Sequence, residues 1–150
     1  MMTFGKCLLG AALFVSIPPS ATAAEPPVLA NDAWVRWLPG HLPAAGYVTL
    51  TNHGKTRQRL VGATSPDYAK VMIHRSIDEN GVERMVATDG IDIAPEASAS
   101  LAPGGYHLML MQPAHPIAPG STVTLHFLFA SGLGLDARAR VLPADATGPR

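Results

Sequence analysis

Hydrophobic and polar residues alternate along this chain in short segments. In residues 122–129, Val123, Leu125, Phe127 and Phe129 alternate with more polar residues, so one face of an extended segment is apolar. Comparable segments predict strands at 33–37, 45–52, 57–63, 70–77, 82–87, 98–101, 106–111, 122–129 and 135–141. Glycine- and proline-rich turns separate them, and no helical periodicity is sustained. The pattern predicts an all-β sandwich or barrel.

The N-terminal residues predict a secretory signal. A single basic residue, Lys6, precedes the apolar run 7–17, and Ala21-Thr22-Ala23 offers small residues for cleavage. The run is too short to span a bilayer. We therefore expect a signal peptide at 1–23, a linker at 24–32, one domain at 33–142 and a loose tail at 143–150.

Composition narrows the possible chemistry. The chain has one cysteine, Cys7, which precedes the apolar core of the signal and so does not resemble a lipid-attachment cysteine. Its removal excludes blue-copper sites, cysteine zinc sites and cysteine nucleophiles. Loss of Lys6 leaves 11 − 1 = 10 basic residues against 11 acidic ones. No basic cluster indicates nucleic-acid binding, and no second apolar run predicts stable membrane insertion.

Most of the six histidines have ordinary explanations. His41 and His115 lie among prolines in expected loops, and His53 occupies an Asn-His-Gly turn. His126 is predicted to lie on the solvent side of its strand, opposite the apolar face. The remaining two, His74 and His107, are the candidates for chemistry.

Each of these two histidines shares a strand face with methionine. In 106–111, His107, Met109 and Met111 alternate with the apolar side. His107 and Met109 are then about 6.6 Å apart along one face, so both side chains can reach one ion. In 70–77, Met72 and His74 likewise share a face. A single methionine of this kind is usually core filler, but two such pairs indicate a site.

The segment 78–81 predicts a hairpin that adds Met85 to this face. A four-residue loop pairs Ile77 with Val82 and places His74 directly opposite Met85. A two-residue Asn80-Gly81 turn instead makes Met85 the diagonal neighbour of His74 on the same face. A three-residue loop would separate them.

Ligand chemistry selects the metal. Thioethers are soft and uncharged and favour Cu(I) over zinc, magnesium or calcium, while imidazole adds affinity without charge. Hard metals would need carboxylates, and no Asp or Glu is expected within the cluster. The candidate Cu(I) ligands are listed together as His74, Met85, His107 and Met109.

At these residues the chain resembles the periplasmic copper chaperone family PCuAC. The family signature is a histidine, ten residues, a methionine, twenty-one residues, and His-x-Met, which is the spacing from His74 to Met109 here. The blocks 46–52, 59–63 and 103–111 are also similar to those of the family. Two departures are Arg75, where some members have methionine, and a tail at 143–150 without the histidines and methionines that bind further copper in some members.

The resemblance implies a cupredoxin-like Greek-key β-sandwich that binds Cu(I) through the four residues. It also implies a periplasmic location and delivery of copper to the copper A centre of cytochrome c oxidase, with a thioredoxin-like copper-metallation protein as a further partner. No enzyme is expected, since no catalytic triad or carboxylate dyad stands out. Two alternatives stay open: copper sequestration or resistance with the same site, and a structural or adhesive β-sandwich without metal.

Overall fold

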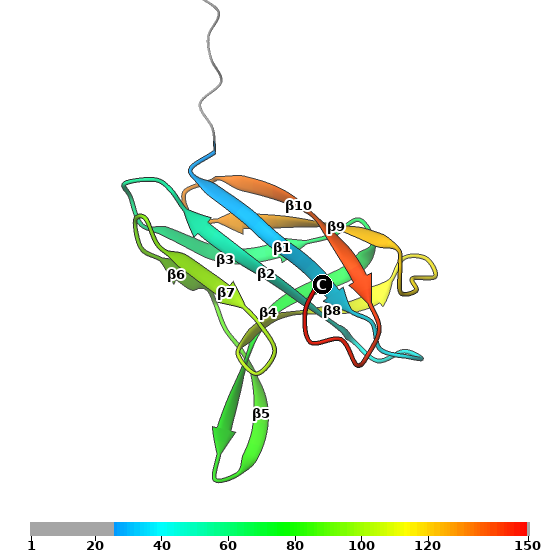
Figure 1. Ribbon diagram of the computed structural model, residues 1–150. Coiled ribbons are helices and arrows are strands. Elements are labelled where there is room, and N and C mark those ends of the chain that lie inside the picture. The colour runs from blue at the N-terminus through cyan, green and yellow to red at the C-terminus, as the bar shows by residue number, and fades with distance from the viewer. Residues whose placement is uncertain (1–25, 150) are drawn as a thin grey trace, which may run out of the picture.

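The computed structural model describes residues 26–149, which form strands and connecting loops without helix (Figure 1). The strands are β1 (Val28–Arg36), β2 (Ala44–Asn52), β3 (Gln58–Thr64), β4 (Tyr68–Glu79), β5 (Val82–Ala87), β6 (Ile91–Ile93), β7 (Ser98–Leu101), β8 (Tyr106–Pro113), β9 (Thr122–Phe129) and β10 (Gly134–Leu142). The predicted all-β architecture is confirmed. None of the described residues forms a helix long and apolar enough to cross a membrane.

One continuous sheet wraps around the core in the order β5-β4-β8-β2-β1-β10-β9-β3-β6, with β7 pairing β2. Most neighbours are antiparallel, but β1 and β10 run parallel and pair through Trp34 and Arg140. In Figure 1 the strands form a flattened sandwich from which β5 and the end of β4 project. The strands that carry the predicted ligands, β5, β4 and β8, are consecutive at one edge of this sheet.

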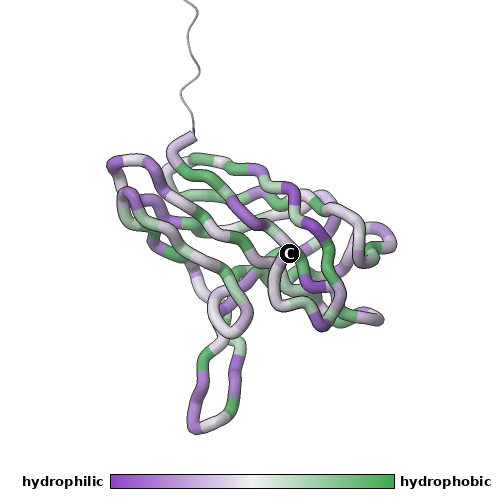
Figure 2. Tube along the Cα trace, viewed as in Figure 1, coloured by the Kyte–Doolittle hydropathy of each residue, from purple (hydrophilic) through white to green (hydrophobic). Residues whose placement is uncertain are grey.

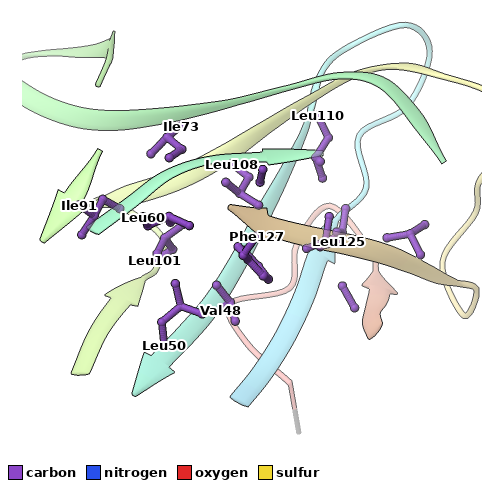
Figure 3. Packing of buried hydrophobic residues seen from close by; sticks show 14 of the residues in the cluster. Val48, Leu50, Leu60, Ile73, Ile91, Leu101, Leu108, Leu110, Leu125 and Phe127 are labelled. Carbon is purple, nitrogen blue, oxygen red and sulfur yellow. The ribbon is translucent and has the colours of Figure 1, made fainter. Parts of the chain in front are cut away.

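Inward-facing side chains of both layers fill the interior. Phe127 and Leu125 of β9 belong to one buried cluster with Leu108 of β8 and Leu50 of β2, and all four are fully buried (Figure 3). The core side of β8 lies close to β2, where Gly46 is paired with Leu108. A Cβ at Gly46 would lie 3.2 Å from the Leu108 Cβ, so the absence of a side chain lets these strands approach.

The structure corrects one boundary at the N-terminal side and adds one strand in the middle of the chain. β1 begins at Val28, so residues 28–32 belong to a strand and not to the expected linker. A bulge between Asn31 and Trp34, with Asp32 at φ 53°, interrupts the alternation and hid this part of the strand. The three-residue strand β6 was also missed because it is too short to show a period. The predicted signal peptide lies outside the described residues.

Candidate metal centre

The pairing of β4 with β8 brings the two candidate histidines together. His74 is directly opposite His107, and their ring centroids are 5.9 Å apart with the rings at 66°. Their neighbours in sequence, Ile73 and Leu108, are buried in the core. Because side chains alternate along a strand, both imidazoles therefore lie on the opposite face of the sheet.

A hydrogen bond at the start of β8 positions the His107 ring. Its side chain is only 5% exposed, and its Nδ1 lies 3.3 Å from the carbonyl oxygen of Gly105. A carbonyl can only accept, so Nδ1 carries the proton and donates this hydrogen bond. The Nε2 lone pair is then free to bind a metal, and the hydrogen bond fixes the ring in the usual manner of metal-ligating histidines.

His74 has two buried ring nitrogens without a hydrogen-bond partner among the described residues. Burial lowers the pKa of His74, and the nearby His107 ring lowers it further. The imidazole is therefore held neutral, which is the form that can bind a metal. Buried polar groups are almost always paired, so two unpaired nitrogens beside a second imidazole indicate a missing partner.

The β4–β5 hairpin places Met85 on the same face but further from the histidines than a direct pair. Glu79 pairs with Val82, so the turn is the two-residue Asn80-Gly81, with φ values of 56° and 81°. The four-residue loop is wrong, and the diagonal register is confirmed. Met85 is opposite Ser76 and is 60% exposed. The hairpin carrying it extends away from the sandwich and mixes hydrophilic and hydrophobic segments (Figure 2).

A pocket of about 320 Å³ is lined by three of the four candidate side chains, Met85, His107 and Met109. His74 lies beside it but is not part of its lining. The pocket is also lined by Arg36 and Glu83. These two opposite charges cancel formally. Glu83 adds a carboxylate to the pocket wall beside the four candidate ligands.

The C-terminal segment reaches this pocket. Arg36 lies over the rings of Trp34 and Tyr47, at 5.6 and 5.4 Å from their centroids. Its Nε donates a 3.0 Å hydrogen bond to the carbonyl of Ala146, and Ala144 lines the pocket. This hydrogen bond ties the predicted loose tail to β1 at Ala146, while most residues of 143–149 are exposed.

The other histidines lie elsewhere, as the sequence indicated. His126 projects from β9 and pairs with Asp136. His115 Nε2 lies 2.8 Å from an oxygen of Asp67. Among residues 26–149, no three side chains of His, Cys, Asp or Glu form a metal cluster. The four candidate ligands offer imidazole and thioether groups, a soft and neutral set suited to Cu(I).

Sequence reasoning missed one soft donor of this face. Met72 is directly opposite Met109 across β4 and β8. The alternation of residues predicted that Met72 and His74 share a face, but it did not predict that β8 is the neighbouring strand.

Comparison with known proteins gives both sequence and structural relatives. The family model described as "LpqE-like: Putative lipoprotein LpqE-like" matches residues 28–141. "Putative lipoprotein Lxx21020" of Leifsonia xyli subsp. xyli (strain CTCB07) is 32% identical over 106 residues. That match covers 70% of this chain and 63% of the relative, so the chain spans less than two thirds of that protein.

Two solved structures share the architecture. The "apo PmoF2 PCuAC domain" has a TM-score of 0.67 and 25% identity, covering 84% of this chain and 98% of that one. The CuI form of DR1885 from Deinococcus radiodurans has a TM-score of 0.63 and 27% identity, covering 82% of this chain and 83% of that one. The predicted cupredoxin-like β-sandwich is confirmed.

Proposed function

Because this chain belongs to the LpqE-like, PCuAC-type family, we propose that it is a copper-binding chaperone that carries Cu(I) in the periplasm. The observation that carries the proposal is the His74–His107 pair, in which one imidazole has two buried nitrogens without partners and the other has Nε2 free. The proposed ligands are those predicted from the sequence: His74, Met85, His107 and Met109. The chain then acts as a carrier and not as an enzyme.

The donor set supports copper in its reduced state. Two neutral imidazoles and two thioethers add no charge, so Cu(I) leaves the site at +1 while Cu(II) would leave +2. The charged residues of the pocket wall, Arg36 and Glu83, cancel formally and do not offset the second charge. DR1885, a structural relative, is described in a CuI form.

The position of the site suits transfer. Met85 is largely exposed on an edge hairpin, while His107 is almost fully buried. A carrier with neutral ligands can yield Cu(I) to an acceptor with thiolates, which are softer and charged. We propose the copper A domain of cytochrome c oxidase as the acceptor, with a thioredoxin-like protein as a further partner in metallation. The predicted signal peptide and the lipoprotein description of the family support export.

Cu(I) titration with a competing chelator of known affinity tests binding. The purified protein should bind one Cu(I) tightly under anaerobic conditions, and His107→Ala should abolish that binding. If the wild-type protein cannot compete with the chelator for Cu(I), the copper proposal fails and the alternative of a structural β-sandwich without metal remains. Tighter binding of Cu(II) than of Cu(I) would contradict the ligand argument.

A transfer experiment tests delivery. Protein loaded with Cu(I) is mixed with a reduced, metal-free copper A domain, separated, and both fractions are assayed for copper. Delivery predicts that copper moves to the acceptor in stoichiometric amount. Copper that stays on this protein in the presence of excess acceptor would favour sequestration.

A further inference from the structure

Met72 lies on the same face of the sheet as the histidine pair. It is directly opposite Met109, one same-face position along both strands from the His74–His107 pair. The Ser76 amide donates to Gly105 at 3.1 Å, which makes 76/105 a hydrogen-bonded pair. Hydrogen-bonded pairs recur every second residue, so both side-chain pairs have α-carbons about 5.5 Å apart. The four side chains therefore occupy a patch of about 5.5 by 6.6 Å.

Core packing does not explain Met72. It is partly exposed, and its neighbours Val71 and Ile73 face the interior. Met72 belongs neither to the buried cluster nor to the partly buried residues packed against it. A thioether outside the core and beside two imidazoles is thus available to a soft ion.

Met85 approaches the histidines from the other end of the patch. Its pair, with Ser76, lies four residues along β4 from the position of Met72, which is opposite Met109. On a flat sheet, Met85 and Met109 would be about 13 Å apart along the strands and about 10 Å apart across them. Met85 and Met109 nevertheless line one pocket, so both side chains border the same hollow. Met85 therefore faces the histidine pair from the edge strand of the sheet, and Met72 faces it from within the sheet.

We propose that Met72 is a further Cu(I) ligand, which alternates with Met85 in completing a site whose other ligands are His74, His107 and Met109. The proposal rests on the copper-binding function given above. In the exchange, the bond from copper to the Met85 sulfur breaks as the bond to the Met72 sulfur forms. Both sulfurs are neutral donors, so copper stays Cu(I), and no proton or electron moves. The ion keeps its ligand number when the hairpin is drawn away toward an acceptor.

X-ray absorption and chelator competition on four proteins test this inference: wild type, Met72→Leu, Met85→Leu and the double variant. Leucine is close to methionine in volume, so folding is retained, and urea unfolding of each variant verifies it. We expect copper in Met85→Leu to keep two sulfur ligands and copper in the double variant to keep one. Removal of Met72 should weaken binding at least tenfold more in the Met85→Leu background than in wild type. Met72→Gln, which keeps the chain length without the sulfur, should behave like Met72→Leu.

Met111→Leu is the matched control, because Met111 shares the face but is opposite Lys70 and one position further from the histidines. Two results together would overturn the role of Met72 and leave copper binding intact. Copper in Met85→Leu would have one sulfur ligand, and in that background Met72→Leu would weaken Cu(I) binding no more than Met111→Leu does. Failure of the wild type to bind Cu(I) would overturn the proposed function itself.

Discussion

Replacing His74 with leucine should stabilise the metal-free protein. Both ring nitrogens of His74 are buried and unpaired within residues 26–149, so the folded state carries the desolvation cost of a donor and an acceptor. An unsatisfied buried polar group costs about 1–3 kcal/mol. Leucine has a similar size and no polar atoms, so His74→Leu should raise the free energy of unfolding by about that amount. For a domain of this size the gain corresponds to about 4 °C in Tm per kcal/mol.

Copper should reverse this order. A ligand that binds only the folded state stabilises it by about 4 kcal/mol at a free concentration a thousandfold above Kd. Wild type gains this increment with Cu(I), whereas His74→Leu has lost one imidazole ligand and gains much less. The less stable protein without metal thus becomes the more stable one with metal.

Urea unfolding monitored by circular dichroism, with a strong chelator and then with saturating Cu(I), measures both effects. His126→Leu is the control, because His126 is a half-exposed strand histidine paired with Asp136 and its loss should change stability by no more than about 0.5 kcal/mol. A His74→Leu protein that is less stable than wild type without metal would refute the reasoning, since it would mean that the ring nitrogens are satisfied in solution.

The same variant should change the pH dependence of stability. Burial lowers the pKa of His74 in the folded protein, so as pH falls below about 6.5 the unfolded chain takes up a proton that folded His74 resists. Wild type therefore loses stability on acidification through this range. His74→Leu should show a shallower loss between pH 7 and 5 in the absence of metal. Equal slopes for both proteins would contradict the assigned neutral form.

Three further predictions follow from other contacts. Met109→Leu should lower Cu(I) affinity more than tenfold, a loss above about 1.4 kcal/mol, while Met111→Leu should not; a larger effect of Met111→Leu in chelator competition would reassign the ligand. Gly46→Ala should destabilise the fold by about 1–3 kcal/mol in urea, because its Cβ would meet leucine atoms of β8 at 3.2 and 3.3 Å; an unchanged midpoint would show that β2 can yield. The Thr124 amide holds the pKa of Asp67 below its ordinary value, so stability from the ionised carboxylate should be lost as pH falls through that pKa. Asp67→Asn should remove this loss, measured as the urea midpoint against pH, and an unaltered profile would disprove it.

Local patterns carried most of the fold prediction. Alternation and turn residues located nine of the ten strands, because a strand with one buried face repeats every two residues. The exceptions have local causes. The bulge at Asp32 broke the alternation of β1, and the three residues of β6 are too few to show a period. The tail 143–149 has no hydrophobic residue larger than alanine to predict packing, and its contact with Arg36 is made through a backbone carbonyl.

The faces of the candidate site could be predicted from local patterns, but the pairing of its strands could not. The faces of β4 and β8 could be read separately, and the Asn80-Gly81 turn limited the register of the hairpin. The pairing of β4 with β8 joins segments more than thirty residues apart, and no local signal fixes it. That pairing is what sets His74 against His107 and Met72 against Met109. The proposal for Met72 therefore required the three-dimensional structure.

The parallel pairing of β1 with β10 has a consequence for how the chain folds. β10 lies between β1 and β9, and Trp34 is paired with Arg140 at the opposite end of the chain. Contacts between such distant residues form slowly, in milliseconds to seconds for sandwiches of this kind. Until residues 134–142 arrive, β1 and β9 each present an unpaired edge to other chains. The growing polypeptide is thus most vulnerable to intermolecular strand pairing just before its last strand is complete.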